Sequence, residues 1–301
     1  TSPLAIYETR PTCGGHYYRR GWELMVDTKN LVGEFTWDTS LTFSKTNSFW
    51  KERLPNYDYQ IYQQRENEPM SAYYYYNVTG IINTDRSNMP ESQKTLQAEA
   101  QLPGCPIIED KNKDGKIDEN DVYMKDNSPA IYVGIGNTFT YKRFEFSFFM
   151  YGQFGIQKYN IAYSAAQAGP LAVDYPENSN KFAYRLWNSQ TNPNGSRPGL
   201  AIGKMGALPG NAWVNADREN ASFMRMRNIT LAYNLAGNIL GSLQRYVRNI
   251  KVYVDAQNPF ILTKFQGFDP EIYTGGGGAS GGSRGEYPQT RTFSLGVNIT
   301  F

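Results

Sequence analysis

The segment from Asp110 to Asp121 has the residue types and spacing of a calcium-binding loop. With Asp110 as position 1, oxygen-bearing side chains fall at positions 1, 3, 5, 9 and 12, glycine stands at position 6, and position 7 offers a backbone carbonyl. This is the spacing of an EF-type loop, with Asp in place of the usual Glu at position 12. The predicted ligands are Asp110, Asn112, Asp114, Lys116, Asp118 and Asp121. No amphipathic helices flank the loop, so a paired EF-hand is not expected. An acidic turn that binds no metal stays open as the alternative.

Aromatic residues in the long connections are weaker candidates for a ligand site. Four consecutive tyrosines, Tyr73, Tyr74, Tyr75 and Tyr76, would stack on sugar rings or contact another domain, and packing in the interior is an equal alternative. Trp187 and Trp213 lie in a connection rich in Asn, Gly and Pro, where anchoring of the loop is the alternative to ligand binding. The glycine-rich run at residues 275–282 follows no strand-to-helix pattern, so a phosphate-binding loop is not expected.

The composition excludes several classes of protein. Lys and Arg number 30 against 28 Asp and Glu in 301 residues, so the net charge of +2 argues against a nucleic-acid binder. With His16 as the only histidine and no carboxylate pair placed across a cleft, we predict no enzymatic activity. Cys13 and Cys105 lie far apart, and the sequence leaves open whether they pair. No stretch approaches the ~18 consecutive apolar residues of a transmembrane helix.

Apolar and polar residues alternate along the end of the chain. Phe293, Leu295, Val297, Ile299 and Phe301 are separated by single small or polar residues. Side chains alternate between the two faces of a strand, so this segment has one apolar and one polar face. The same pattern predicts strands at residues 20–29, 34–46, 131–141, 143–154, 222–234 and 249–257. Several are longer than the roughly five or six residues usual in globular proteins.

The connections between these strands alternate in length. Short or modest connections follow residues 29, 141 and 234, whereas long ones cover about residues 48–130, 155–221 and 259–290. Short turns at one end and long loops at the other are typical of an outer-membrane barrel. We therefore predict an all-β, transmembrane antiparallel β-barrel wall, with a soluble β-sandwich as the alternative. Seven such strands cannot close around a lumen, and an open edge in lipid leaves backbone groups unpaired, so we expect part of a larger barrel.

Several motifs follow one another along the chain in a fixed order. One begins at Asn67-Glu-Pro-Met70 and continues through the four tyrosines to Thr79-Gly-Ile81. The others are the acidic loop with the hairpin after it, Ser222–Tyr233, Val252–Phe260 with Gly267–Glu271, and Tyr287-Pro288 with Arg291–Phe301. In order and spacing over about residues 17–301, these motifs resemble those of the SusC/RagA family, the TonB-dependent outer-membrane transporters of Bacteroidota. Tyr74-Tyr-Tyr76 replaces the family's Tyr-Gly-Tyr, and residues 98–109 diverge.

The resemblance implies a 22-stranded barrel with a plug domain inside it. Residues 1–301 would be the C-terminal part of that barrel, about seven strands with their outer loops, and the plug would be absent from this chain. The implied function is import of oligosaccharides or peptides across the cell outer membrane, together with a SusD-like surface lipoprotein. TonB would act through the missing plug region, and the chain would contact the rest of the barrel, the plug and outer-membrane lipid. The sequence does not specify the substrate.

Two other functions stay open from the sequence. A SusC-like barrel, split between two chains, would scaffold a larger outer-membrane complex and import nothing. A secreted calcium-binding β-domain that binds glycans would be soluble without detergent, which the apolar strand faces disfavour. A plug and a TonB-contacting segment encoded upstream would distinguish import from the scaffold.

The apolar row at the end of the chain is predicted to be the signal read by the barrel-assembly machinery. It consists of Phe293, Leu295, Val297, Ile299 and Phe301. Deleting Phe301 should therefore reduce insertion into the outer membrane, measured as the folded fraction on unboiled gels. Normal insertion of the shortened protein would contradict this assignment.

Overall fold

The computed structural model describes residues 15–53, 58–63, 66–128, 131–160, 184–267, 269–271 and 288–301. Cys13, the glycine-rich run 275–282 and Tyr287 lie outside these residues, and so do the predictions that concern them. Cys105 is a buried free thiol, and burial raises its pKa to about 11. Among the helices formed by the described residues, none has the length and apolar character needed to cross a membrane.

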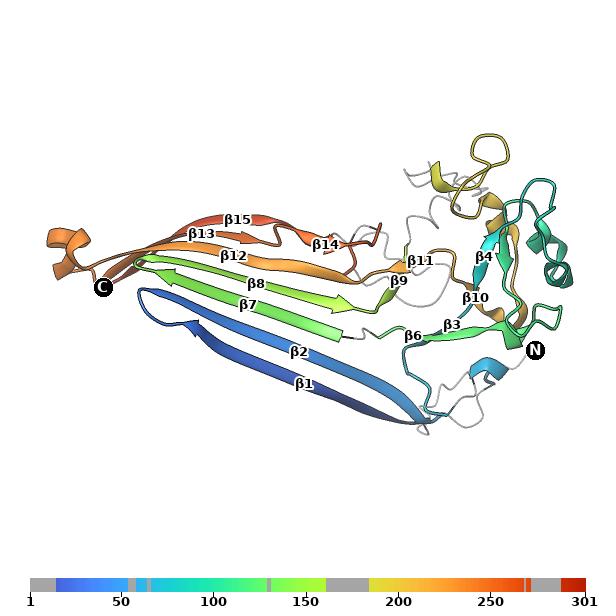
Figure 1. Cartoon of the computed structure of the whole chain (residues 1–301), viewed down its shortest axis with the longest axis horizontal. Helices are drawn as coiled ribbons and strands as arrows, with labels where there is room; N and C mark the ends of the chain where they lie inside the picture. The colour runs from blue at the N-terminus through green and yellow to red at the C-terminus, as the bar shows by residue number, and fades with distance from the viewer. Residues whose placement is uncertain are drawn as a thin grey trace, which may run out of the picture.

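One long antiparallel sheet is the largest element of the fold (Figure 1). Its spatial order is β1 (His16–Leu31), β2 (Phe35–Glu52), β7 (Ile131–Tyr141), β8 (Phe144–Phe154), β12 (Phe223–Ala236), β13 (Asn249–Gln257) and β15 (Thr292–Thr300). A short strand, β14 (Ile261–Thr263), also pairs with β12. All seven predicted strands are confirmed. Strand β2 extends to Glu52, beyond the predicted residue 46, because it stays paired with β1 as far as His16.

The two faces of the sheet differ in chemistry, as the alternation predicts. On the apolar face, aromatic rings stack across neighbouring strands, with centroids 5.2 Å apart for Trp22 and Phe43. On the polar face, Lys251 Nζ lies 2.9 Å from a carboxylate oxygen of Glu145. The exposed apolar residues of β15 continue the apolar face to its edge; they are Phe293, Leu295, Val297 and Ile299, with Phe301 just beyond.

A β-bulge explains the least regular of the predicted strands. The pairing of β12 with β8 shifts register between Met226 and Asn228, which adds one residue to β12. By simple alternation, Arg225 would share the apolar face with Leu231. The extra residue reverses the phase, so that Arg225 pairs with Tyr151 on the polar face. A buried guanidinium is thereby kept off the apolar face.

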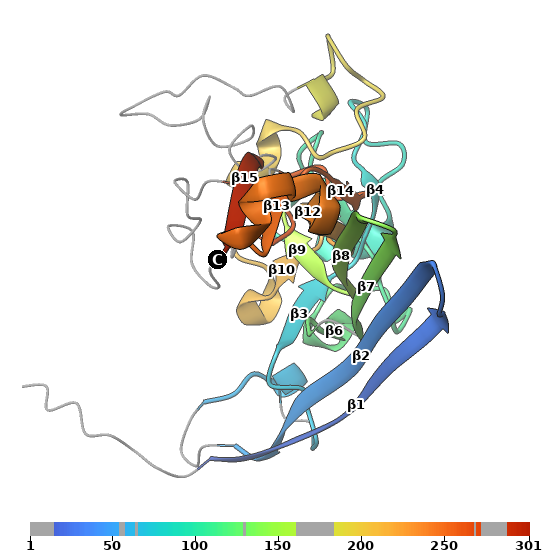
Figure 2. The same cartoon turned by 90° about the vertical axis from the view of Figure 1, so that its left-hand side faces the viewer.

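The long connections fold into an outer subdomain at one end of the sheet (Figures 1 and 2). Strands β3 (Ala72–Tyr76), β6 (Tyr123–Asp126) and β10 (Trp213–Val214) form one small sheet, and β4 (Val78–Ile81) pairs with β5 (Pro106–Ile108). Strands β9 (Gln157–Tyr159) and β11 (Arg218–Asn220) form another pair. The 3-10 segments there are η1 (Ile61–Gln63), η2 (Glu91–Thr95), η3 (Ala98–Gln101), η4 (Glu119–Asp121), η7 (Leu200–Lys204) and η8 (Pro209–Asn211).

The outer subdomain has its own hydrophobic core, drawn from the first and second long connections. Buried side chains from residues 62–122 pack with Met205, Leu208 and Ala212. The short turns lie at the opposite end of the sheet, where η9 (Gly237–Arg245) connects β12 and β13. The predicted separation of long loops from short turns is therefore confirmed.

If the apolar face contacts lipid, Val254→Lys should destabilise the folded barrel by about 2–4 kcal/mol, because an ammonium group then enters the bilayer. Val254 is half exposed on this face of β13. The matched control is Ser294→Lys on the polar face, beside Asp255. Urea titration of the whole receptor in lipid vesicles measures both, and equal effects of the two substitutions would argue against a lipid-facing apolar surface.

Candidate functional site

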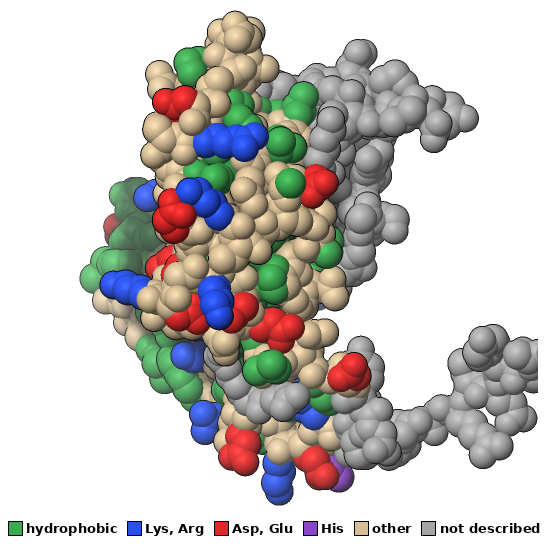
Figure 3. Space-filling view, turned by 90° about the vertical axis from the view of Figure 1, so that its right-hand side faces the viewer, with side chains coloured by type: hydrophobic (Ala, Val, Ile, Leu, Met, Phe, Trp, Pro, Cys, Tyr) green, Lys and Arg blue, Asp and Glu red, His purple; other side chains and the backbone are tan. Residues whose placement is uncertain are grey.

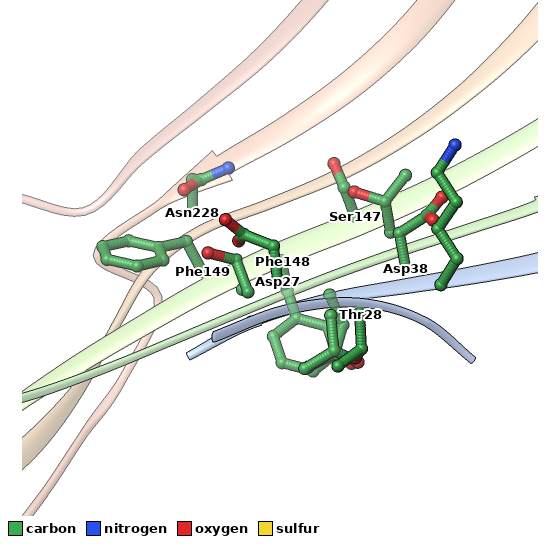
Figure 4. Close-up of a pocket in the computed structure, with 13 residues that line it drawn as sticks. Asp27, Thr28, Asp38, Ser147, Phe148, Phe149 and Asn228 are labelled. Atoms are coloured by element: carbon green, nitrogen blue, oxygen red, sulfur yellow. The ribbon is translucent and has the colours of Figure 1, made fainter. Parts of the chain in front are cut away.

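A hollow of about 470 Å³ lies against the middle strands of the large sheet (Figure 4). Strands β1, β2, β7, β8 and β12 all contribute to its lining. The polar-face residues that line it include both signs of charge, hydroxyl groups and an amide, namely Asp27, Lys29, Asp38, Ser40, Thr138, Ser147 and Asn228. Such a surface offers hydrogen-bond donors and acceptors to a polar ligand, and has no group arranged for covalent chemistry.

An aromatic ring, that of Phe149, lies among these polar groups. Figure 4 shows the ring beside Asn228, whereas Phe148 points to the opposite side of the sheet. The ring has room because β7 carries glycine beneath it. A Cβ on Gly134 would approach the ring to 3.4 Å, and one on Gly136 to 3.7 Å. Sequence reasoning missed this hollow, although a phenylalanine on a polar face was an available signal.

The four tyrosines are divided between the two faces of β3. Tyr76 is fully buried and its hydroxyl donates to the carbonyl oxygens of Asp118 and Pro209, both at 3.0 Å. Tyr74 donates to the buried carboxylate of Glu68. Both side chains therefore stabilise the outer subdomain, as expected for interior packing.

Tyr73 and Tyr75 point the other way and stack on each other, with ring centroids 4.8 Å apart. The Arg218 guanidinium covers the Tyr73 ring at 3.5 Å, and Tyr123 stacks on Tyr75 at 5.7 Å. Their ring faces are thus largely occupied. Among the described residues, none donates to or accepts from the buried Tyr73 hydroxyl. A ligand could therefore reach the edges of the Tyr73 and Tyr75 rings but could not stack on their faces.

The two tryptophans lie in different environments. Trp187 packs on glycine, because a Cβ on Gly104 would come within 2.7 Å of its ring. Its backbone N–H donates to the Arg197 carbonyl at 2.8 Å, as expected for an anchor of the loop. Trp213 is 66% exposed at the surface of the outer subdomain, which leaves it accessible to a ligand. The structure does not bring Trp187, Trp213 and Phe149 together in one hollow.

The acidic loop is closed by hydrogen bonds between its carboxylates and its own backbone. Asp110 accepts from the N–H of Gly115 at 2.8 Å, and Asp114 accepts from the N–H of Lys116 at 2.9 Å. The fully buried Asp121 accepts from Lys111 and Asp118, both at 2.9 Å. Within the described residues, no three carboxylate, imidazole or thiol groups are gathered as in a metal site.

Arg225 anchors the third long connection to the sheet. Its guanidinium is buried and donates to both oxygens of Asp269, at 2.7 and 2.8 Å, and to Glu271. The Tyr151 hydroxyl also donates to Glu271. Asp269 in turn accepts from the Gln289 N–H at 3.2 Å, so both stems of this connection meet at one charged cluster. The sequence indicated these residues as motifs but not their contact.

Comparison with known proteins places this architecture in a family, although no family model matches the chain. TonB-dependent receptor P3 of Formosa agariphila is 26% identical over 95% of this chain and 29% of its own length. TonB-dependent receptor SusC of Bacteroides thetaiotaomicron is 27% identical over 93% of the chain and 26% of its own length. TonB-dependent receptor P26 of Formosa agariphila reaches 30% over 70% of the chain and 21% of its length. The chain belongs to the SusC-like TonB-dependent receptors.

The same fold occurs in a solved structure of the RagAB peptide transporter. The TM-score is 0.68 at 19% identity, over 95% of this chain and 29% of that one. The chain therefore spans less than a third of the length of the receptors it resembles. TonB-dependent receptors are transport proteins of the outer membrane, with a barrel of antiparallel strands, and they are not enzymes.

The outer end of this receptor segment presents charged side chains of both signs among hydrophobic ones (Figure 3). One carboxyl near this end, that of Asp217, is almost fully buried. No described residue donates to its Oδ1. Burial raises the pKa of Asp217 to about 6, with Arg197 lowering it and Glu219 raising it further. Arg197 donates to Glu219 at 2.7 Å, so its positive charge is divided between the carboxylates of Glu219 and Asp217.

The folded receptor thus binds a proton at Asp217 more tightly than the unfolded chain does. The free energy of unfolding should fall as pH rises from about 4 to about 6, by up to roughly 3 kcal/mol, and should stay level above that. Asp217→Asn should remove this fall, so the variant should be the more stable protein at pH 8. Hydrogen exchange of the backbone amides around Asp217 measures the difference in stability between wild type and Asp217→Asn at each pH. A stability difference that is the same at pH 4 and pH 8 would contradict this prediction.

Proposed function

We propose that the chain forms part of the wall of an outer-membrane importer, which takes up oligosaccharides or peptides together with a SusD-like surface lipoprotein. The observation that carries the proposal is the seven-stranded wall, apolar on one face and polar and hollowed on the other. The described parts of all three long connections lie at the same end, as long loops do in barrels that bind their ligand outside the cell. Membership of the TonB-dependent receptors supports the same function.

The lining of the hollow suits a polar ligand with some apolar surface. Carboxylates, an ammonium group and an amide bind hydroxyls or peptide groups, and the Phe149 ring offers a flat apolar surface. Pyranose rings and peptide side chains both have this mixture of properties. The related RagAB is a peptide transporter by name, which makes peptides as reasonable a ligand as sugars.

Uptake by cells that carry the whole receptor tests this proposal. Phe149→Leu keeps an apolar side chain but removes the flat ring, so it should reduce uptake of the ligand about fivefold. The matched control is Phe146→Leu on the apolar face of β8, which should leave uptake unchanged. Labelled oligosaccharides and peptides are supplied in parallel. A correctly inserted receptor that supports uptake of neither would favour the scaffold function instead.

We also propose that the acidic loop binds Ca²⁺ and stiffens the outer subdomain. Asp110, Asn112 and Asp114 are already neighbours, since the Asn112 amide donates to Asp114 at 3.1 Å and the Asp114 N–H donates to Asp110 at 3.2 Å. The oxygens of Asp110 and Asp114 each retain a lone pair beyond the backbone hydrogen bonds they accept. The Lys116 carbonyl, Asp118 and Asp121 would complete the set, with water where aspartate is too short. Gly115, at φ +86°, adopts a turn that other residues rarely tolerate.

Calcium titration by calorimetry tests this second proposal. Asp114→Ala should weaken Ca²⁺ binding at least about tenfold, because it removes a charged ligand. Asp85→Ala is the matched control, since Asp85 also closes an exposed turn through the Ser87 N–H but lies outside the loop. Protease digestion with and without a chelator reports on stiffening. Identical heats for the wild-type receptor and Asp114→Ala would leave the loop as a turn that binds no metal.

A further inference from the structure

The end of the sheet opposite the outer subdomain, hereafter the turn end, has an exposed surface that transport does not explain. It comprises the connections at residues 31–35, 141–144 and 236–249. Eight apolar or aromatic side chains are exposed there, namely Leu31, Val32, Phe35, Tyr141, Phe144, Ile239, Leu243 and Tyr246. Exposed apolar side chains gathered at one end of a molecule indicate an interaction surface.

Part of this surface continues the apolar face of the sheet. Phe35 stacks on Phe139 with centroids 6.2 Å apart, and Phe144 packs against Tyr233 in a tilted arrangement with centroids 4.7 Å apart. These rings form an aromatic row where the strands end, which is the height of a membrane–water interface. The row is therefore continuous with the surface that faces lipid.

The remainder comes from η9, which projects beyond the strands (Figure 1). Leu240 of this segment is buried, whereas Ile239, Leu243 and Tyr246 are exposed. The helical path is interrupted at Gly241, where φ is +51°. A short segment with exposed apolar residues beside cations is suited to the headgroup region of a bilayer.

The charge of the turn end is predominantly positive. Lys142, Arg245 and Arg248 are exposed, and the Lys142 ammonium lies over the Tyr141 ring at 5.2 Å. Arg143 is half-buried, and no described residue accepts from its Nη1. Among the described residues of these three connections, Glu34 is the one exposed acidic residue, against three exposed cationic residues. This balance complements a negatively charged surface.

We propose that the turn end binds anionic phospholipid, with Lys142, Arg245 and Arg248 contacting headgroup phosphates while the side chains of Leu243 and Tyr246 enter the interface. A phospholipid leaflet fits better than a protein partner, because two aromatic side chains of the turn end, Phe35 and Phe144, pack directly against rings of the apolar face. The inference rests on the proposed membrane location, and adds that this end selects the headgroup of the lipid it contacts.

The test uses the whole receptor, reconstituted into nanodiscs containing an equal mixture of phosphatidylglycerol and phosphatidylcholine with the same acyl chains. Lipid that stays with the protein after detergent extraction is identified by mass spectrometry. We expect phosphatidylglycerol to be enriched in wild type. In the combined variant Lys142→Ser, Arg245→Ser and Arg248→Ser, the enrichment of phosphatidylglycerol should fall about tenfold, since each cation near an anionic surface contributes to binding.

The matched control replaces three exposed cations of the outer subdomain, Arg86→Ser, Lys94→Ser and Lys113→Ser, and should keep the enrichment. Raising NaCl to 0.5 M should weaken it in wild type without any substitution, which gives a second measurement if the triple variant folds poorly. An importing receptor that shows no headgroup preference, or a triple variant that keeps it, overturns the proposal alone. A receptor that cannot enter nanodiscs overturns the membrane function with it.

Discussion

Strand pairing in a membrane is the constraint on which the rest of this structure depends. Backbone N–H and C=O groups have no water to bond with in lipid, so long strands must pair along their whole length. Pairing fixes the side chains on alternate faces, and one face then has to be apolar. This alternation places the aromatic stacks between neighbouring strands on the apolar face. It places the ion pair of Lys251 with Glu145 on the polar face.

The bulge in β12 shows how the rule accommodates a charged residue. Without the register shift near Met226, the guanidinium of Arg225 would lie on the apolar face. With it, Arg225 lies on the polar face and holds Asp269 and Glu271. A local change of one residue in the pairing thus provides the anchor for a connection that begins more than thirty residues later in the chain.

The outer subdomain and the turn end differ because they meet different surroundings. The long connections lie beyond the large sheet, so they build a separate core that joins residues 62–122 with Met205, Leu208 and Ala212. The turns need no such core, because they are short and their aromatic side chains continue the apolar face of the sheet. The hollow lies between these ends, where the polar face offers hydrogen-bonding groups.

The sequence by itself determined the seven strands, their two faces, the placement of long and short connections, and the family. Each of these follows from local periodicity and from motifs whose residues lie close in the chain. Only the tertiary structure decided how strands β1, β2, β7, β8 and β12 line the hollow around Phe149, which face of β3 each tyrosine takes, and how deeply Asp217 is buried. These depend on the register between strands and on contacts between segments far apart in sequence, which periodicity does not specify.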